Sequence, residues 1–128
     1  MTQEKLNILN VDLCARLPYE VKIKYLPDDR LDGIVLPYLH NRLTVLQKGA
    51  ISYRAHIKSI RPYLRPLSSM TEEEEIYYNT IYTTLKFYEK EDWLNAHHFD
   101  YRIDPSTGKT LIESNLAIKA PEGMYKID

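Results

Sequence analysis

Cysteine and glycine are scarce in this chain of 128 residues, and each scarcity removes a class of function. The single cysteine, Cys14, can form no disulfide within the chain and cannot build a cysteine-rich zinc site. Cys14 lies on the apolar stripe of an expected helix, so we expect it to be buried rather than reactive. With four glycines in total, a glycine-rich loop that cradles a nucleotide phosphate is not expected.

Long apolar runs are also missing. No stretch approaches the roughly 20 apolar residues of a membrane-spanning helix. The polar start MTQEKLN does not have the basic-then-apolar layout of a signal peptide. We therefore expect a cytoplasmic protein that makes no contact with a membrane.

Acidic residues are absent between Gly33 and Thr71, although the whole chain has a net charge of −1. Residues 1–70 hold eleven Lys and Arg against six Asp and Glu, whereas residues 71–128 hold six against twelve. The acid-free segment carries six basic residues: Arg42, Lys48, Arg54, Lys58, Arg61 and Arg65. Tyrosines lie between them, a composition typical of a groove that follows a phosphate backbone and stacks bases. The same basic surface could instead face the acidic run 72–75 or solvent, and a pI near 6.4 is low for a nucleic-acid-binding domain.

The hydrophobic pattern predicts an α+β fold in a single domain that spans 1–128. Leucines recur at helical spacing from Leu6 to Leu17 and Pro18 ends the run, which predicts an N-terminal helix with Thr2 as its cap. Alternating apolar and polar residues predict a strand, and three β-rich segments follow it: 19–25, then 33–39, 42–49 and 50–57. Short connections favour antiparallel neighbours, so we expect a small antiparallel β-sheet or barrel of about four strands.

The basic β part, 1–67, gives way to an acidic helical part, 68–128. Pro62 and Pro66 are expected to break regular structure between the two. Two pairs have the spacing of a capping box: Ser69 with Glu72, and Thr71 with Glu74. We expect a long helix from here to about Lys90, then a short helix capped by Asp92 and a short helical or irregular tail. The long helix has one face formed by Ile76, Thr80, Ile81, Thr84, Leu85 and Tyr88.

The stretch DWLNAHHFDYR, residues 92–102, is the most unusual in the chain. It supplies six candidate binding residues: Trp93, His97, His98, Asp100, Tyr101 and Arg102. Adjacent histidines point about 100° apart on a helix and are poorly placed to share one ion, although either could join Asp100 and a sheet histidine, His40 or His56. A hydrolytic site would pair a histidine base with a serine or Cys14, but no nucleophile turn is recognisable. The packing interpretation needs no metal, no cofactor and no catalytic residue, and it predicts that Trp93 is largely buried.

Three segments resemble a known family. They are DLCARLPYEVKI, IKSIRPYLRPLSSMTEEEE, and DWLNAHHFDYR followed by NLAIKAPEGMY. Together they resemble a family of small uncharacterised proteins of gut bacterial genomes and their prophages, in which LCARLPYGVK, KPYLRPMSSMTEEE and WLNAHHFDYRGLI recur. The resemblance covers about half of the chain and implies a phage or mobile element in a bacterial host, with no assigned activity. The chain departs from the family at Glu20, where Gly is usual, and at IDPSTGKT, which is inserted after Arg102.

Eleven tyrosines favour contact with another protein, because Tyr and Arg are enriched at interface hot spots. Three of them, Tyr77, Tyr78 and Tyr82, lie too far round the expected long helix for all to be buried. We therefore expect a non-enzymatic accessory protein of a phage or mobile element that acts as a protein-binding module, through a protein partner or self-association. Two alternatives stay open: a single-stranded nucleic-acid-binding protein that uses segment 33–70, and a small metal-dependent hydrolase or nuclease that uses the HHFD stretch.

Overall fold

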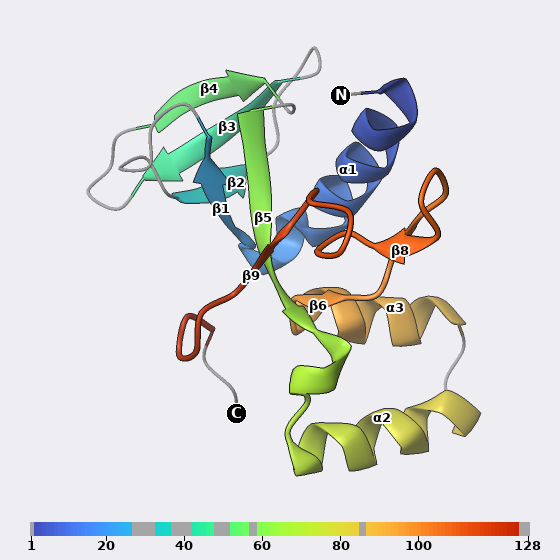
Figure 1. The fold of residues 1–128 in the computed structure, drawn as a ribbon. Helices are drawn as coiled ribbons and strands as arrows, with labels where there is room; N and C mark the ends of the chain where they lie inside the picture. Colours follow the sequence, from blue (N-terminus) through green and yellow to red (C-terminus); the bar gives the residue numbers. More distant parts are fainter. Residues whose placement is uncertain are drawn as a thin grey trace.

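The structure, a computed structural model, describes residues 2–26, 33–36, 42–47, 52–56, 59–84 and 87–125. It is an α+β fold, as the sequence predicts, in which the described residues form a mixed sheet accompanied by three helices (Figure 1). The helices are α1 (Gln3–Arg16), α2 (Glu72–Thr84) and α3 (Phe87–Ala96). The strands are β1 (Lys22–Tyr25), β2 (Gly33–Leu36), β3 (Arg42–Gln47), β4 (Ser52–His56), β5 (Ile60–Pro66), β6 (Phe99–Asp100), β7 (Ile103–Asp104), β8 (Lys109–Thr110) and β9 (Ile118–Lys119). Within these described ranges, no helix combines the length and the apolar character that a membrane crossing requires.

The main sheet has the strand order β4-β3-β2-β1-β5-β6, and β9 also pairs with β5. Strands β1 to β4 are antiparallel neighbours, with Val35 opposite Val45 and Leu43 opposite Ala55. Strand β5 is antiparallel to β1 but parallel to β6 and β9. The prediction of about four antiparallel strands is confirmed for β1–β4, whereas the parallel pairing around β5 was not predicted.

Strand β5 contains both prolines that the sequence predicts to break regular structure. Pro62 lies opposite Ile23 of β1, while the parallel neighbour β9 pairs at Tyr63 and Leu64. A proline has no N–H to donate, so a strand tolerates it where only one neighbouring strand pairs with that residue. Pro62 is paired with β1 alone. The prediction was therefore wrong for 60–66, and most of β5 is buried in the middle of the fold.

The hydrophobic core lies between α1, β1, β5 and the turn-rich segment 111–117. Its members are Leu9, Leu13, Val21, Ile23, Ile60, Leu64, Leu111, Leu116 and Ala117. The helical spacing in α1 and the strand period in β1 are thus confirmed, as is the cap, because the Lys5 N–H donates to Thr2 Oγ1 at 3.3 Å. Cys14 is exposed, so the expectation of a buried thiol was wrong. The inner face of α1 is completed by the charged residues Asp12 and Arg16 instead.

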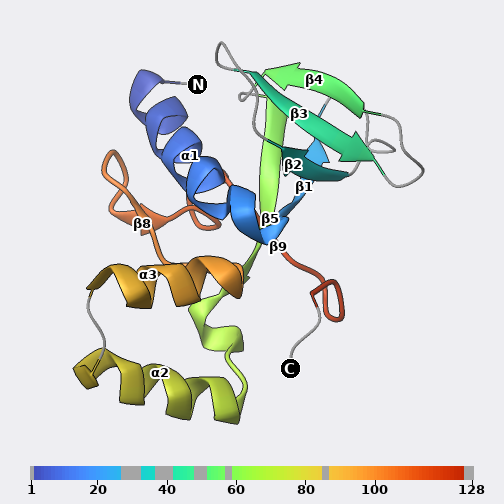
Figure 2. The ribbon, with the colours of Figure 1, turned by 180° about the vertical axis from the view of Figure 1, so that it is seen from behind.

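The expected long helix is two shorter helices, α2 and α3, which run in opposite directions (Figure 1). One predicted capping box is confirmed: the Glu74 N–H donates to Thr71 Oγ1 at 3.2 Å, and the Thr71 N–H donates to Glu74 Oε1 at 2.9 Å. Asp92 lies inside α3 and does not begin a helix, so that prediction was wrong. Helix α2 lies at the end of the molecule away from β1–β4, with α3 between α2 and the rest (Figures 1 and 2).

The segment IDPSTGKT, residues 103–110, forms a small hairpin of its own. Strands β7 and β8 pair antiparallel, and the N–H of Gly108, whose φ is 71°, donates to the Asp104 carbonyl at 2.8 Å. The Asp104 side chain accepts hydrogen bonds from the Ser106 N–H and hydroxyl and pairs with Lys5 at 3.1 Å. The turn of this hairpin, residues 105–108, is exposed, and the hairpin follows β6 in the chain.

Glu20 follows the short 3₁₀ turn Leu17–Tyr19 with a φ of 53°, a left-handed conformation that favours glycine. Replacing Glu20 by Gly should raise the free energy of unfolding by about 0.5–1 kcal/mol, because relief of the Cβ strain outweighs the extra chain entropy of glycine. Urea unfolding of Glu20→Gly measures the gain, with Glu20→Ala as the matched control that keeps the Cβ atom. An equal gain in both variants would attribute the effect to the lost charge and not to the backbone.

Candidate functional site

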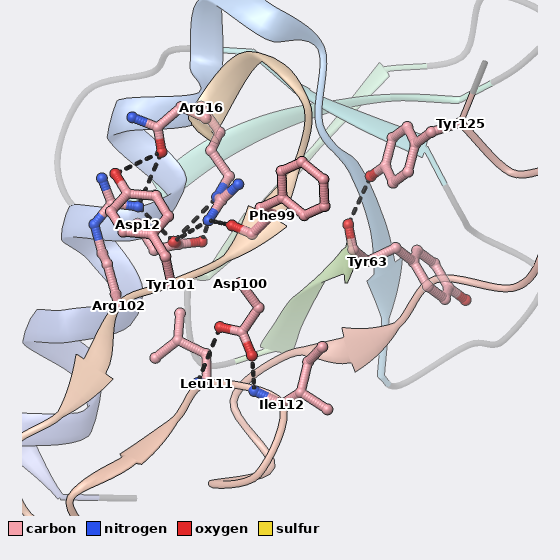
Figure 3. A network of polar contacts seen from close by, with 11 residues as sticks. Asp12, Arg16, Tyr63, Phe99, Asp100, Tyr101, Arg102, Leu111, Ile112 and Tyr125 are labelled. Atoms are coloured by element: carbon pink, nitrogen blue, oxygen red, sulfur yellow. Dashed lines mark hydrogen bonds and ion pairs between the residues drawn. The ribbon is translucent and has the colours of Figure 1, made fainter. Parts of the chain in front are cut away.

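The stretch 92–102 connects α3 to β6 and lies where α1, β5 and the C-terminal segment meet (Figure 3). Helix α3 ends at Ala96, and His98 reverses the chain with a φ of 62°. The His98 carbonyl then accepts the Arg65 N–H at 2.8 Å, which starts the parallel pairing of β5 with β6. Of the six predicted binding residues, His98 and Asp100 are buried and the other four are partly buried.

A buried ionic network holds this stretch to α1 (Figure 3). Arg16 and Asp12 are 0% exposed, and Arg16 donates from Nε and Nη2 to the Asp12 carboxylate at 2.9–3.0 Å. Arg16 Nη2 also donates to the Phe99 carbonyl at 2.6 Å. Arg102 Nη1 donates to the same Asp12 carboxylate at 2.7 Å, so two guanidinium groups share one carboxylate.

Tyr101 and Arg102, both predicted binding residues, complete this network. The Tyr101 hydroxyl donates to Asn95 Oδ1 at 3.0 Å, and Arg102 Nη1 donates to the same oxygen at 3.1 Å. The Arg102 guanidinium carbon lies 4.6 Å from the centre of the Tyr101 ring, and burial raises the pKa of the Tyr101 hydroxyl. The Tyr101 hydroxyl and Arg102 Nη1 are thus bonded within the protein.

Asp100 organises the C-terminal turn. It is 2% exposed, and its two carboxylate oxygens accept the N–H groups of Leu111 and Ile112 at 3.1 and 3.0 Å (Figure 3). Burial raises the pKa of the Asp100 carboxyl, against the opposing effect of these hydrogen bonds. Among the residues that the structure describes, no group of three or more His, Cys, Asp and Glu side chains is placed to hold a metal ion. His40 and the side chain of His56 lie outside the described part of the chain.

Trp93 is the centre of an aromatic cluster. Its ring lies 5.5 Å from Tyr77, 5.9 Å from Tyr78, 4.5 Å from His97 and 5.7 Å from Phe99, measured between ring centres. His97 Nδ1 donates to the Trp93 carbonyl at 2.9 Å. Trp93 is partly exposed but most of its surface is covered, in agreement with the prediction that it is largely buried. Helix α2 and Phe99 pack on the ring, and a hollow of about 270 Å³ lies beside the part that stays exposed.

His98 and Tyr125 form the wall of a second hollow, of about 320 Å³. The two rings are stacked, with centres 3.9 Å apart and planes 17° apart. The Tyr125 hydroxyl donates to the Tyr63 carbonyl at 2.7 Å and accepts the Lys22 N–H at 2.9 Å. Burial, helped by the nearby charges of Arg16 and other cations, lowers the pKa of His98 to about 4, so the imidazole is neutral at pH 7.

The predicted basic surface is only partly described. Arg65 is 7% exposed and binds both oxygens of Glu74 at 2.6 and 2.9 Å, with its guanidinium 4.2 Å from the centre of the Phe99 ring. Its assignment to an exposed basic surface was therefore wrong, and its partner is the acidic helix. Arg61 is half-buried, and its Nη1 donates to the Ile60 carbonyl. The remaining side chains lie outside the described part: Arg42, Lys48, Arg54 and Lys58.

Sequence reasoning missed the residues that surround the predicted ones. A usable signal existed for Asp12 and Arg16, since a charged pair with i,i+4 spacing falls on the apolar stripe of α1 beside Leu9 and Leu13. Tyr125 and Lys22 carry no such local signal, because the fold alone brings them to His98. Comparison with protein-family models, with curated proteins and with solved structures finds no match. The site is therefore interpreted from its own geometry.

Proposed function

We propose that the chain is a non-enzymatic protein-binding module of a phage or mobile element, and that α2 with the hollow beside Trp93 receives the partner. The exposure of α2 carries this proposal. Of residues 72–80, Glu74 alone is buried, while Ile76 and Tyr77 are 61% and 49% exposed. Single exposed apolar residues are ordinary, but these two are neighbours on an outlying helix.

Four exposed residues of α2 form one stripe. Glu73, Ile76, Tyr77 and Thr80 follow the i, i+3, i+4, i+7 spacing of one helical face, and all four are exposed. Ile76 and Thr80 of the predicted face point to solvent and not to the core. Tyr88 belongs to α3 and is exposed, and the other predicted members lie outside the described side chains: Ile81, Thr84 and Leu85. We name this face the α2 stripe. Its mixture of apolar, aromatic and acidic side chains has the character of a surface that another protein covers.

The chemistry of the α2 stripe favours a partner with basic and apolar side chains. Glu72, Glu73 and Glu75 are exposed, and Glu73 makes no ion pair with any described residue. The hollow beside the stripe is lined by Glu73, Glu74, Tyr77, Trp93 and His97. Because Glu74 is already bonded to Arg65, Glu73 supplies the free charge, and the Tyr77 and Trp93 rings supply faces for a Lys or Arg side chain.

Binding is favoured over catalysis because two of the groups that a hydrolase at the HHFD stretch would use are bonded inside the protein. Asp100 accepts two main-chain N–H groups, and His97 Nδ1 donates to the Trp93 carbonyl. The setting in a phage or mobile element is supported by the sequence resemblance. The two parts of the proposal are therefore independent of each other.

A photo-crosslinking amino acid at position 76 tests the surface, with the same substitution at position 11 as the matched control. Val11 is 53% exposed on α1, so the two probes are exposed to solvent to a similar degree. In a bacterial host, we expect one protein to be crosslinked from position 76 and not from position 11. Once that protein is purified, Ile76→Glu should weaken its binding by about tenfold or more and Val11→Glu should not.

The same crosslinked proteins from positions 76 and 11 would contradict the proposal, as would equal affinities of Ile76→Glu and Val11→Glu for the purified protein. Trp93→Phe adds a finer measurement, because it keeps most of the cluster packing but shrinks the aromatic face of the hollow. A partner that inserts a basic side chain should bind this variant more weakly, while the variant's melting temperature should change little.

A further inference from the structure

We infer that the hollow at His98 and Tyr125 binds a small molecule through an oxyanion group of the carboxylate or phosphate class. The hollow of about 320 Å³ lies between the 3₁₀ turn Leu17–Tyr19, the end of α3 and the C-terminal segment. Its volume is in the range of small-ligand sites. The residues that matter for recognition are Tyr19, Glu20, Lys22, His97, His98 and Tyr125.

The first observation is a buried nitrogen without a partner. His98 is 9% exposed, and its Nδ1 is buried with no hydrogen bond to the described part of the protein. Stacking on Tyr125 holds the plane of the ring. A buried polar atom left unpaired costs about 1–3 kcal/mol, and in a residue that lines a hollow the missing partner is explained by a ligand or ordered water bound there.

The second observation is backbone strain on both sides of the hollow. Glu20 and His98 have φ values of 53° and 62°, in the left-handed region that side chains with a Cβ atom seldom adopt. Both residues line the hollow. Of the non-glycine residues described, the third with positive φ is Asn115, a residue type that tolerates this conformation. Strain of this kind is retained where a binding site requires the geometry.

The third observation is an excess of positive charge. The Lys22 ammonium donates to the Met124 carbonyl at 2.7 Å and pairs with no carboxylate among the described residues. Arg16, whose charge acts on His98, shares the carboxylate of Asp12 with Arg102, so one positive charge of these three residues is not balanced among them. Arg65 is neutralised by Glu74, and Glu20 is the acidic residue of the wall. The balance favours an anion near Lys22 and His98.

Proton uptake by His98 follows from the same charges. The charged or titratable groups that act on His98 are Arg16, His97, Arg65, Lys22 and the stacked Tyr125. The cations and burial keep the imidazole neutral, and an anion in the hollow opposes their effect. His98 therefore takes up a proton when the anion binds, and affinity for the anion increases as the pH falls from 7 towards 5.

The test uses sulfate, which stays a dianion over this pH range, and follows the His98 ring protons by NMR in the full chain. Against chloride at matched ionic strength, 20 mM sulfate should raise the apparent pKa of His98 by about one unit or more. Lys22→Gln should remove at least half of this increase, and Glu20→Gln should enlarge it. Both residues are exposed, so both variants should stay folded, and a thermal melt checks this.

Phosphate and acetate arms then separate the two oxyanion shapes, since a tetrahedral site should respond more to phosphate and a planar one to acetate. Equal titrations in sulfate and chloride would overturn the inference. An undiminished sulfate effect in Lys22→Gln would overturn it as well, because it would reflect general screening. None of these results bears on crosslinking from position 76, so this inference and the proposed function fail separately.

Discussion

Replacing Asp12 by Leu should lower the free energy of unfolding by about 3–5 kcal/mol, measured by urea denaturation at pH 7. The substitution leaves the fully buried Arg16 guanidinium without its carboxylate, and it removes the shared partner of Arg102. The remaining hydrogen bond of Arg16 to the Phe99 carbonyl does not neutralise its charge. Because this network joins α1 to β6, the loss should appear as global unfolding and not as local fraying.

Two controls test whether the loss of stability comes from the unpaired buried charge. Asp92→Leu replaces an exposed aspartate, so it should change the free energy of unfolding by about 0.5 kcal/mol or less. The double variant Asp12→Leu with Arg16→Met removes both buried charges and should recover much of the stability lost in Asp12→Leu, while Arg102 can turn to solvent. If the double variant lost as much free energy of unfolding as the two single variants together, the cost of Asp12→Leu would not come from leaving the Arg16 charge buried without a partner.

The parts of the fold that sequence predicts well are those set by local pattern. The leucine spacing in α1, the alternation in β1 and the Thr71–Glu74 capping box each depend on residues within one turn or one strand. The antiparallel order β1 to β4 follows from short connections. These elements are correct because tertiary contacts agree with the local preference.

The errors occur where long-range contacts decide. Strand β5 contains two prolines, but its burial against β1, β6 and β9 outweighs their poor strand propensity. The boundary between α2 and α3 has no proline or glycine to mark it, so a continuous helix was the natural prediction. The sequence could not show that Ile76 is exposed, because periodicity predicts which residues share a helical face but not whether another element covers that face.

The site shows the same division. The sequence singled out the stretch 92–102, and the structure places it at a junction of several elements, but the partners of these residues come from elsewhere. Arg102 meets Asp12, 90 residues away, and His98 meets Tyr125. Neither contact leaves a pattern in a single sequence. A residue's chemistry can therefore be proposed from sequence, but its protonation and availability depend on neighbours that only the fold supplies.

Acidification should destabilise the protein between pH 6.5 and about 4, and His98 should account for about 2–3 kcal/mol of that loss at pH 4.5. The folded state keeps His98 neutral because burial and the cations around it lower its pKa from 6.5 to about 4. The unfolded chain takes up the proton once the pH falls below 6.5, so protons favour unfolding in this window. Above pH 6.5 both states are neutral at His98 and the effect vanishes, while below about 4 both are protonated and the loss is complete.

His98→Asn isolates this contribution, because asparagine tolerates the left-handed backbone at position 98 and does not titrate. Urea denaturation of both proteins at pH 7 and pH 4.5, in chloride, gives four free energies of unfolding. The variant should be less stable at pH 7, since it loses the stacking on Tyr125, yet it should lose less stability on acidification. Glu74 and Asp100 also have shifted pKa values, lowered for Glu74 and raised for Asp100. Both carboxyls are present in both proteins, so their contributions cancel when the two losses of stability are compared. Equal losses in the two proteins would mean that the His98 imidazole is accessible to protons in the folded state, and the description of a buried, neutral histidine would have to be abandoned.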